Sequence, residues 1–376
     1  MKKPENQSKV LIIAFLKLLR ILSETLRIRF NLKPFITLLR SRFMSTLKIA
    51  ILFSLFITNG HLFSQVIKYP TALTVAQNGS GDYTTIQEAI NAVRDLSQVQ
   101  VKISIKNGIY FEKIIVPSWK TNIALMGESQ ANTIITNGDY TGKDYPGKDL
   151  SGKQKYFTFT SYTVLAQGND FTVENLTIQN TAEPVGQGVA LHIEGDRANV
   201  KNCRLLGHQD TLYAATENSR QYYQGCYIEG TTDFIFGEAT AVFANCIIKS
   251  LTNSYITAAA TSPRQKFGFV FLGCKLIADT SVTKVYLGRP WRPYARTVFV
   301  NCEMGKHIVP EGWDPWKGDA MFPDKEKTTH YAEFGGFGLG ASKDKRVAWS
   351  KQLTENEAKQ VTVKNILGGS DGWNPL

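Results

Sequence analysis

The sequence contains little histidine. Its five histidines are scattered through 376 residues, and none falls in the spacing of a paired metal site: His61, His192, His208, His307 and His330. Isolated histidines are usually structural, because a zinc site draws on closely spaced ligands. A carboxylate cluster of the kind that binds calcium is also missing. We therefore expect neither a metal ion nor another cofactor.

Excess positive charge is confined to the start of the chain. The formal net charge is +11, but residues 1–48 hold 11 Lys and Arg against 2 Asp and Glu, whereas the rest of the chain holds 32 against 30. A nearly neutral domain exerts no general attraction on nucleic acid. The sequence therefore excludes nucleic acid as a general partner, and its hydrophobic content of 43% excludes a disordered chain.

The apolar run at residues 49–57 is too short to span a membrane, which takes about 20 apolar residues. It follows Lys48 and precedes a polar stretch and the segment Leu62-Phe63-Ser64, as in a secretory signal. We interpret residues 44–64, which begin at Met44, as a signal peptide, and residues 1–43 as an extension upstream of the working start. A basic amphipathic anchor over residues 10–38 is the alternative.

Cysteine is also scarce, and an odd number leaves at least one thiol without an intramolecular partner. Each cysteine follows Asn or Gly within a β-prone run, at successive spacings of 23, 20, 28 and 28 along the chain: Cys203, Cys226, Cys246, Cys274 and Cys302. Strands recurring about every 20–30 residues indicate a solenoid. The intervals are too short for crossover helices, which favours a parallel β-helix. Stacked cysteines would fill an inner column as small apolar groups, with a disulfide as the alternative.

A solenoid must cover its ends to prevent edge-to-edge pairing. Thr85 and Glu88 predict a capping box and a helix over residues 85–95 at one end, and Thr354 and Glu357 predict another helix up to residue 367 at the other. We therefore expect one domain over residues 65–376. We expect it to be a monomer, exported to a periplasm or the cell exterior, without stable membrane association after signal cleavage.

Three polar residues and two aromatic residues repeat at one interval. The same 23-residue interval separates Gln187 from Asp210, Asp210 from Asp233, and Tyr213 from Phe236. If this interval is one coil, the polar residues form a row with about 4.8 Å between neighbours, and the aromatic residues form a second row. Two carboxylates that close divide their roles, since like charges raise one pKa and leave one group protonated.

The position of Arg289 in the sequence predicts which aspartate takes which role. It precedes Cys302 by the same interval by which Asp233 precedes Cys246. A guanidinium beside Asp233 would keep that carboxylate ionised and leave Asp210 with the proton. The amides of Gln187 and Gln209 could donate to a developing oxyanion. Gln209 reaches the site only if the chain bends there, because neighbours on a regular strand face opposite ways.

Six motifs in this order resemble those of the pectinesterases, the pectin methylesterases of plants and microbes: NGIYFEKI (107–114), GQGVAL (186–191), GHQDTLY (207–213), GTTDFIFG (230–237), LGRPW (287–291) and the terminal GWNP. The resemblance runs from about residue 66 to residue 375. It implies an all-β, single-stranded right-handed parallel β-helix with short capping helices at both ends. It also implies hydrolysis of methyl-galacturonate esters of pectin to pectate and methanol, without metal or cofactor.

The resemblance implies a role for each matching residue. Asp233 is the nucleophile, and Asp210 is first an acid and then a base. Gln187 and Gln209 bind the oxyanion, and Arg289 orients Asp233. The sugar subsites are lined by aromatic side chains, since sugar C–H faces are apolar: Tyr213, Phe236 and Trp291. The chain departs from the common pattern at His192, where many relatives have Arg and a neutral outward residue is expected here, and at His208, where an aromatic is usual.

Three other functions remain as alternatives. Two carboxylates about 5 Å apart suit a retaining glycosidase, which would shorten the polysaccharide instead of releasing methanol. A β-helix polysaccharide lyase is the second, although it usually needs calcium ligands. A non-catalytic sugar-binding solenoid is the third. Trp313, Trp316, Tyr286 and Tyr294 either extend the cleft or pack in the core.

Overall fold

The computed structural model describes residues 17–18, 20–21, 69–149 and 151–376. Residues 17, 18, 20 and 21 are helical and exposed. The predicted signal peptide (44–64) lies outside the described residues, and so does the predicted extension (1–43) apart from these four, so both stay predictions. No described helix is long and apolar enough to cross a membrane.

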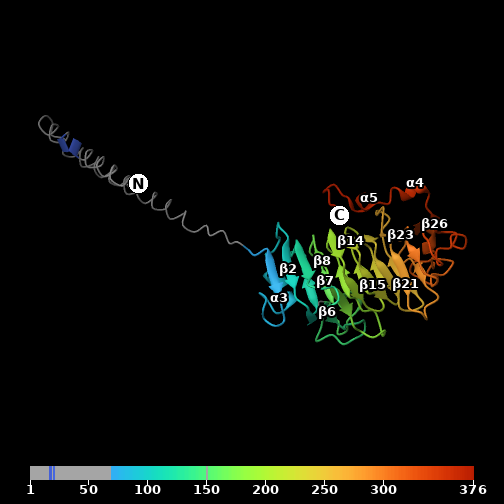
Figure 1. Cartoon of the computed structure of the whole chain (residues 1–376), viewed down its shortest axis with the longest axis horizontal. Helices are drawn as coiled ribbons and strands as arrows, with labels where there is room; N and C mark the ends of the chain where they lie inside the picture. The colour runs from blue at the N-terminus through green and yellow to red at the C-terminus, as the bar shows by residue number, and fades with distance from the viewer. Residues whose placement is uncertain (1–16, 19, 22–68, 150) are drawn as a thin grey trace. The chain divides into compact units, whose positions relative to one another are not determined.

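From Tyr69 onward the chain forms a right-handed parallel β-helix, in which each coil adds strands to three parallel sheets (Figure 1). The first sheet has eleven strands: β1 (Ala72–Val75), β2 (Val101–Ile105), β5 (Ile123–Gly127), β8 (Thr172–Glu174), β11 (Ala198–Lys201), β14 (Arg220–Gln224), β17 (Thr240–Ala244), β20 (Phe269–Leu272), β23 (Arg296–Val300), β25 (His330–Phe334) and β26 (Lys351–Gln352).

The second sheet, which carries the candidate site, has seven strands: β4 (Ile114–Val116), β7 (Val164–Ala166), β10 (Leu191–Ile193), β13 (Leu212–Ala214), β16 (Ile235–Gly237), β19 (Tyr255–Ala259) and β22 (Tyr286–Gly288). The third has eight strands: β3 (Gly108–Phe111), β6 (Thr133–Asn137), β9 (Thr177–Asn180), β12 (Arg204–Leu206), β15 (Tyr227–Gly230), β18 (Ile247–Ser250), β21 (Lys275–Ala278) and β24 (Glu303–Met304). The predicted β-helix is confirmed.

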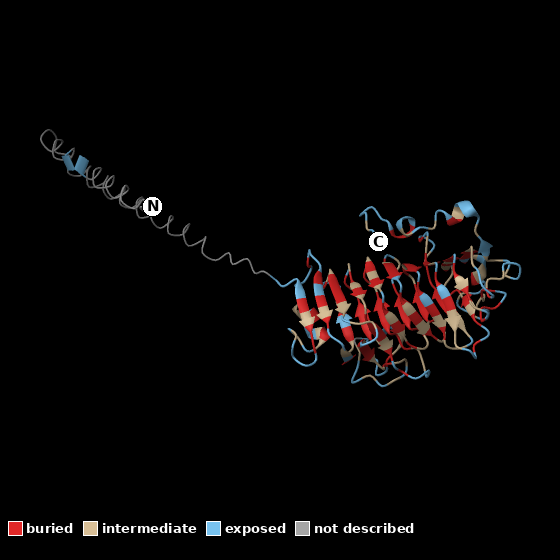
Figure 2. Ribbon diagram, viewed as in Figure 1, coloured by how far each residue is buried: buried red, intermediate tan, exposed pale blue. Residues whose placement is uncertain are grey.

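The core is a continuous column inside the coils, and much of each enclosing strand is buried (Figure 2). Alternate residues of a strand point inward. In-register pairing stacks identical or similar side chains along this column. Phe243, Phe271 and Phe299 on β17, β20 and β23 stack with ring centroids 4.5 and 4.3 Å apart. Such stacks bury large apolar areas and add the aromatic contact itself, so they stabilise each coil against the next.

The Asn-Cys and Gly-Cys repeat marks one corner of the coil. The residue before each cysteine has a positive φ of 47–62°: Asn202, Gly225, Asn245, Gly273 and Asn301. Gly and Asn tolerate this left-handed conformation best, which explains why they recur there. The turn points each cysteine inward, and all five are buried free thiols. The disulfide alternative is therefore wrong.

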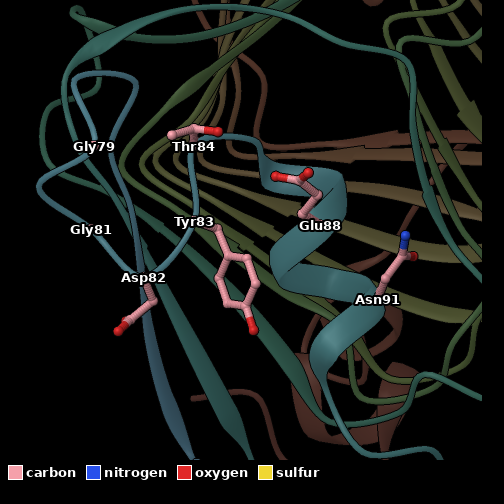
Figure 3. A pocket seen from close by; sticks show the side chains of 7 residues that line it. All are labelled: Gly79, Gly81, Asp82, Tyr83, Thr84, Glu88 and Asn91. Atoms are coloured by element: carbon pink, nitrogen blue, oxygen red, sulfur yellow. The ribbon is translucent and has the colours of Figure 1, made fainter.

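Helix α3 (Ile86–Ala92) covers the N-terminal end of the column, as predicted. Its N-cap Thr85 accepts a hydrogen bond from the backbone N–H of Glu88 (3.3 Å). Ile86, Ala89 and Ile90 of the helix and Val93 just after it are buried against the column. A surface pocket opens beside this helix, between Glu88 and Asn91 on α3 and the turn that holds Gly79 and Asp82 (Figure 3).

The C-terminal helix differs from its prediction. Residues 355–367 form two short helices, α4 (Glu355–Ala358) and α5 (Val363–Leu367), instead of one. The break occurs because Thr362 has an extended backbone and caps α5 by accepting from Asn365 N–H (3.2 Å). Ile366 and Leu367 pack against apolar residues of the eleven-strand sheet. Helix α5 thus covers the flank of the β-helix rather than its end (Figure 1).

Candidate active site

Asp210 and Asp233 occupy the same position in successive coils. Each lies two residues before a strand of the seven-strand sheet, and the register pairs Leu212 of β13 with Ile235 of β16. Both aspartates have left-handed backbones, with φ of 66° and 50°. Non-glycine residues adopt this conformation only where the surrounding structure holds them there. The 23-residue interval is therefore one coil at this point.

The same interval does not place Gln187 in that row. The register between β10 and β13 pairs Leu191 with Leu212, so this coil is two residues shorter than the one that separates Asp210 from Asp233. Ala190 and Leu191 both donate to the Thr211 carbonyl, which is a β-bulge: two residues of the segment after Gln187 face one residue of the next coil. Gly188 N–H donates to the Gln209 carbonyl (3.0 Å). Gln187 therefore neighbours Gln209, which brings the two amide residues together in successive coils.

The chain bends at Asp210, directly after Gln209. The left-handed φ of Asp210 interrupts the alternation that would otherwise turn neighbouring residues to opposite faces. Gln209 lines a surface pocket of about 560 Å³, together with His208, Thr231, Thr232 and five other residues, and neither Asp210 nor Asp233 lines it. The bend that the sequence left as a condition is thus present.

Arg289 binds Asp233 through two parallel hydrogen bonds. It directly follows β22, and its Nε donates to Asp233 Oδ1 (3.0 Å) while its Nη2 donates to Oδ2 (2.7 Å). Asp210 lies one coil away, and no described residue donates a hydrogen bond to its carboxyl. The guanidinium therefore distinguishes two carboxylates that are otherwise equivalent in the fold.

The pKa shifts follow from this contact. Both carboxyls are buried, with exposed fractions of 8% for Asp210 and 5% for Asp233. Burial and the charge of Asp233 raise the pKa of Asp210 well above its ordinary value. Burial also raises the pKa of Asp233, but the hydrogen bonds and charge of Arg289 oppose that rise. Arg289 thus acts in the expected direction, although burial makes the net shift of Asp233 upward.

An aromatic surface continues from the aspartates along the seven-strand sheet. Tyr213 and Phe236 stack with centroids 4.5 Å apart and planes 5° apart, and the Trp291 ring stands edge-on 5.8 Å from Phe236. Phe159, on a short 3-10 helix (Thr158–Thr160), lies 5.3 Å from Tyr213, and none of the sequence motifs pointed to it. The one sequence signal for Phe159 is its position in the long segment between β6 and β7.

His192 lies under this surface. Its exposed fraction is 3%, and its ring lies 4.4 Å from that of Tyr213 in the next coil. Burial lowers its pKa, which agrees with the expected neutral form, and Nε2 lies 3.2 Å from Glu194 Oε1. The Tyr213 hydroxyl donates to Glu238 Oε2 (3.2 Å), a half-buried carboxylate that the motifs did not reveal.

No group of three or more His, Cys, Asp or Glu side chains that could hold a metal ion occurs among the described residues. The residues gathered at this site are two differently tuned carboxyls, two amide residues on successive coils and one arginine. Such a set suits nucleophilic attack by one carboxylate with proton transfer by the other.

Known proteins share this arrangement of coils. The sequence profile of the pectinesterase family matches residues 72–370. Putative pectinesterase 11 of Arabidopsis thaliana is 38% identical over 316 residues, which cover 82% of this chain and 83% of that protein. The chain spans about half (53%) of a longer Arabidopsis relative, probable pectinesterase/pectinesterase inhibitor 23.

Solved structures agree. Pectin methylesterase from carrot is 34% identical, with a TM-score of 0.71 over 80% of this chain and 93% of that one. A pectin methylesterase in complex with hexasaccharide VII is 31% identical, with a TM-score of 0.68 over 81% and 98%. The chain therefore belongs to the pectinesterase family and is a carboxylic ester hydrolase.

Proposed function

We propose that this protein hydrolyses the methyl esters of galacturonate units in pectin, with Asp233 as nucleophile and Asp210 as acid and then base. The family and the similar structures support pectin de-esterification. The observation that carries the assignment of roles is the paired contact of Arg289 with Asp233 alone. It makes Asp233 the carboxyl that ionises more readily, whereas Asp210 retains a proton.

In the first half of the reaction, an Asp233 oxygen attacks the ester carbonyl carbon and forms a C–O bond. The carbonyl oxygen becomes an oxyanion, to which the amides of Gln187 and Gln209 donate. One such donor is worth about 3 kcal/mol in other enzymes. The bond to the methoxy group then breaks while Asp210 transfers its proton to the leaving oxygen. Methanol departs, and the acyl group remains on Asp233 as an anhydride.

In the second half, Asp210 is a carboxylate and accepts a proton from water. The water oxygen attacks the acyl carbon, and the bond to Asp233 breaks. The product is a carboxylic acid that releases its proton to solvent and leaves as a carboxylate, Asp210 is protonated again, and Asp233 is ionised beside Arg289. The proton balance closes because the second step returns to Asp210 the proton that the first step consumed.

The aromatic surface binds the sugar chain in this proposal. Trp291 is half-buried, whereas Tyr213 and Phe236 stack on each other and expose only 8% and 4% of their surface, so they offer ring edges to a sugar. Pyranose C–H faces are apolar and pack on such rings. The pocket lined by Gln209 also holds the side chains of Thr231, Thr232 and Thr252, and in this proposal it would take a neighbouring sugar unit.

Asp233→Asn tests the assignment. We expect methanol release from methyl-esterified pectin to fall to background, because an amide is not a nucleophile at this position. The fold should persist, which circular dichroism and the melting temperature would check. Asp344→Asn, at an exposed aspartate, is the matched control and should retain full activity. Full activity of Asp233→Asn would remove Asp233 from the mechanism.

One assay separates the esterase from its rivals. Methanol and new reducing ends are measured in parallel on the same pectin. The proposal expects methanol without chain shortening, whereas a glycosidase or a lyase would shorten the chain and release no methanol. A sugar-binding solenoid would produce neither. We propose that the protein acts on pectin outside the cytoplasm and as a monomer, in keeping with the predicted signal peptide.

A further inference from the structure

Trp316 has a backbone conformation that is rare for a bulky residue. Its φ is 55°, in the left-handed region that bulky residues rarely adopt. Asp314 Oδ1 accepts a hydrogen bond from Trp316 N–H (2.7 Å) and fixes the turn. Such a conformation costs of order 1–3 kcal/mol, which other contacts of the residue must offset. The side-chain contacts of Trp316 show what the turn achieves.

The Trp316 ring lies on the guanidinium of Arg289. The Arg289 Cζ atom is 3.6 Å from the centroid of the Trp316 ring and 4.0 Å from that of Tyr255. Two aromatic rings thus contact the flat guanidinium, and its Nε and Nη2 edge remains available for Asp233. Stacking restrains rotation of the guanidinium, so the Arg289 side chain loses less conformational entropy when it forms the paired hydrogen bonds to Asp233.

Lys325 anchors the same ring. Its Nζ lies 4.3 Å from the Trp316 centroid and pairs with Asp319 Oδ2 at 2.7 Å, although the lysine side chain is fully buried. A buried ammonium requires such partners, because an isolated one would be costly. Trp316 therefore has a cation at Arg289 and a second cation at Lys325, which together determine where its ring lies.

We propose that Trp316 is a positioning residue, which holds Arg289 in the plane where it binds Asp233, and is not primarily a platform for sugar. The inference rests on the proposed function, since it presumes that Asp233 must be ionised and oriented for attack. Besides Arg289, the charged or titratable groups that interact with Asp233 are Asp210, Asp314, Lys325, Tyr255 and Tyr331. Arg289 alone among the described groups that interact with Asp233 binds it through paired hydrogen bonds. The orientation of Arg289 therefore decides how well the charge of Asp233 is stabilised.

The test compares Trp316→Leu with Trp316→Phe in methanol-release kinetics across a pH series. Loss of the ring in Trp316→Leu should lower kcat about 10-fold, the scale of a well-desolvated cation–π contact, and leave KM within about 2-fold. The acidic limb of the kcat/KM profile should move to higher pH, because a less restrained Arg289 stabilises the Asp233 carboxylate less. Trp316→Phe keeps a flat face and should recover part of both losses.

Two control variants make the result specific. Trp291→Leu removes a ring proposed to contact sugar and should raise KM without moving the acidic limb. Trp119→Leu, at an exposed tryptophan (54% of its surface) in the first coils, should behave as the unmodified protein. If Trp316→Leu fails to fold, Trp316→Phe carries the test, since it retains most of the ring volume.

Two outcomes would overturn the inference. A higher KM with unchanged kcat and pH profile would make Trp316 a sugar platform, and unchanged kinetics in both Trp316 variants would leave it no part in the site. These failures differ from failure of the proposed function, in which the unmodified protein itself would release no methanol from pectin.

Discussion

At the scale of single residues, two chemically identical side chains at equivalent positions acquire different chemistry. Asp210 and Asp233 share backbone conformation, burial and place in the coil. One neighbour distinguishes them, because Arg289 binds only Asp233. A solenoid makes such asymmetry easy to build, since a repeated corner presents the same residue twice and a third coil supplies the partner.

Arg289→Leu tests this asymmetry. Arg289 lowers the pKa of Asp233 relative to what burial alone would produce. Its loss raises that pKa, so the ionised nucleophile is lost at a higher pH as the solution is acidified. We expect the acidic limb of kcat/KM to move up by about 1–2 pH units. Arg264→Leu, which removes an exposed arginine paired with Glu217, should leave the profile in place. An unmoved limb in Arg289→Leu would contradict the proposed role of the arginine.

At the scale of elements, the loop that follows β6 is tied down at its base by Asp139. The buried carboxylate of Asp139 accepts hydrogen bonds from Lys113 Nζ (2.9 Å), Lys143 Nζ (2.8 Å) and Asn137 Nδ2 (2.9 Å). Further along the loop, Thr141 N–H donates to the Gln187 carbonyl (2.9 Å). The loop thus connects a charged anchor to a residue proposed to bind the oxyanion.

Asp139→Asn should destabilise the protein in a pH-dependent way. Although burial raises the pKa of Asp139, its hydrogen bonds lower it more, from 3.8 to about 2. A depressed carboxyl pKa stabilises the folded state above the unfolded pKa, and this contribution is lost as the pH falls from about 4 to about 2. We expect a cost of about 2 kcal/mol near neutral pH.

Urea unfolding of Asp139→Asn at pH 7 and at pH 3 measures this prediction, and the gap from the unmodified protein should narrow at the lower pH. Asp144→Asn removes a carboxylate whose side chain is 90% exposed and paired with Lys155. As a surface pair it should cost well under about 1 kcal/mol. An equal gap at both pH values would show that the charge of Asp139 is not what anchors the loop.

At the scale of the whole molecule, the C-terminal segment joins coils that are distant in sequence. Arg220 in β14 donates to both carboxylate oxygens of Asp371 (2.9 and 2.7 Å), and Lys201 Nζ donates to the Pro375 carbonyl (3.2 Å). In a solenoid each coil otherwise contacts only its neighbours. These contacts, together with the apolar packing of α5, link the end of the chain to its middle (Figure 1).

A chain that begins at Gln65 should fold and act like the full-length protein. The compact unit that holds every proposed site residue starts at Tyr69. We expect one cooperative unfolding transition and a kcat for methanol release within about 2-fold of the full chain. N-terminal sequencing of the exported protein should read from Gln65. A different first residue would contradict the signal peptide at residues 44–64, and an inactive Gln65 chain would contradict the domain boundary.

The sequence by itself determined the coil and most of the proposed site. Asn-Cys and Gly-Cys corners reveal the repeat because only small or left-handed-tolerant residues suit that turn. The 23-residue interval correctly paired Asp210 with Asp233, since their strands are in register. It misplaced Gln187, because that coil is shorter: Leu191 pairs with Leu212, 21 residues further on, so the matching 23-residue count does not reflect the register.

Only the tertiary structure decided which side chains meet across long separations. Trp316 reaches Arg289 because a loop beyond β24 folds back over β22, and Phe159 reaches Tyr213 although six strands lie between them in the sequence. Loops between coils follow no period, so spacing carries no information about where their tips lie. The burial that raises both aspartate pKa values is likewise a property of the folded surroundings, and no local pattern encodes it.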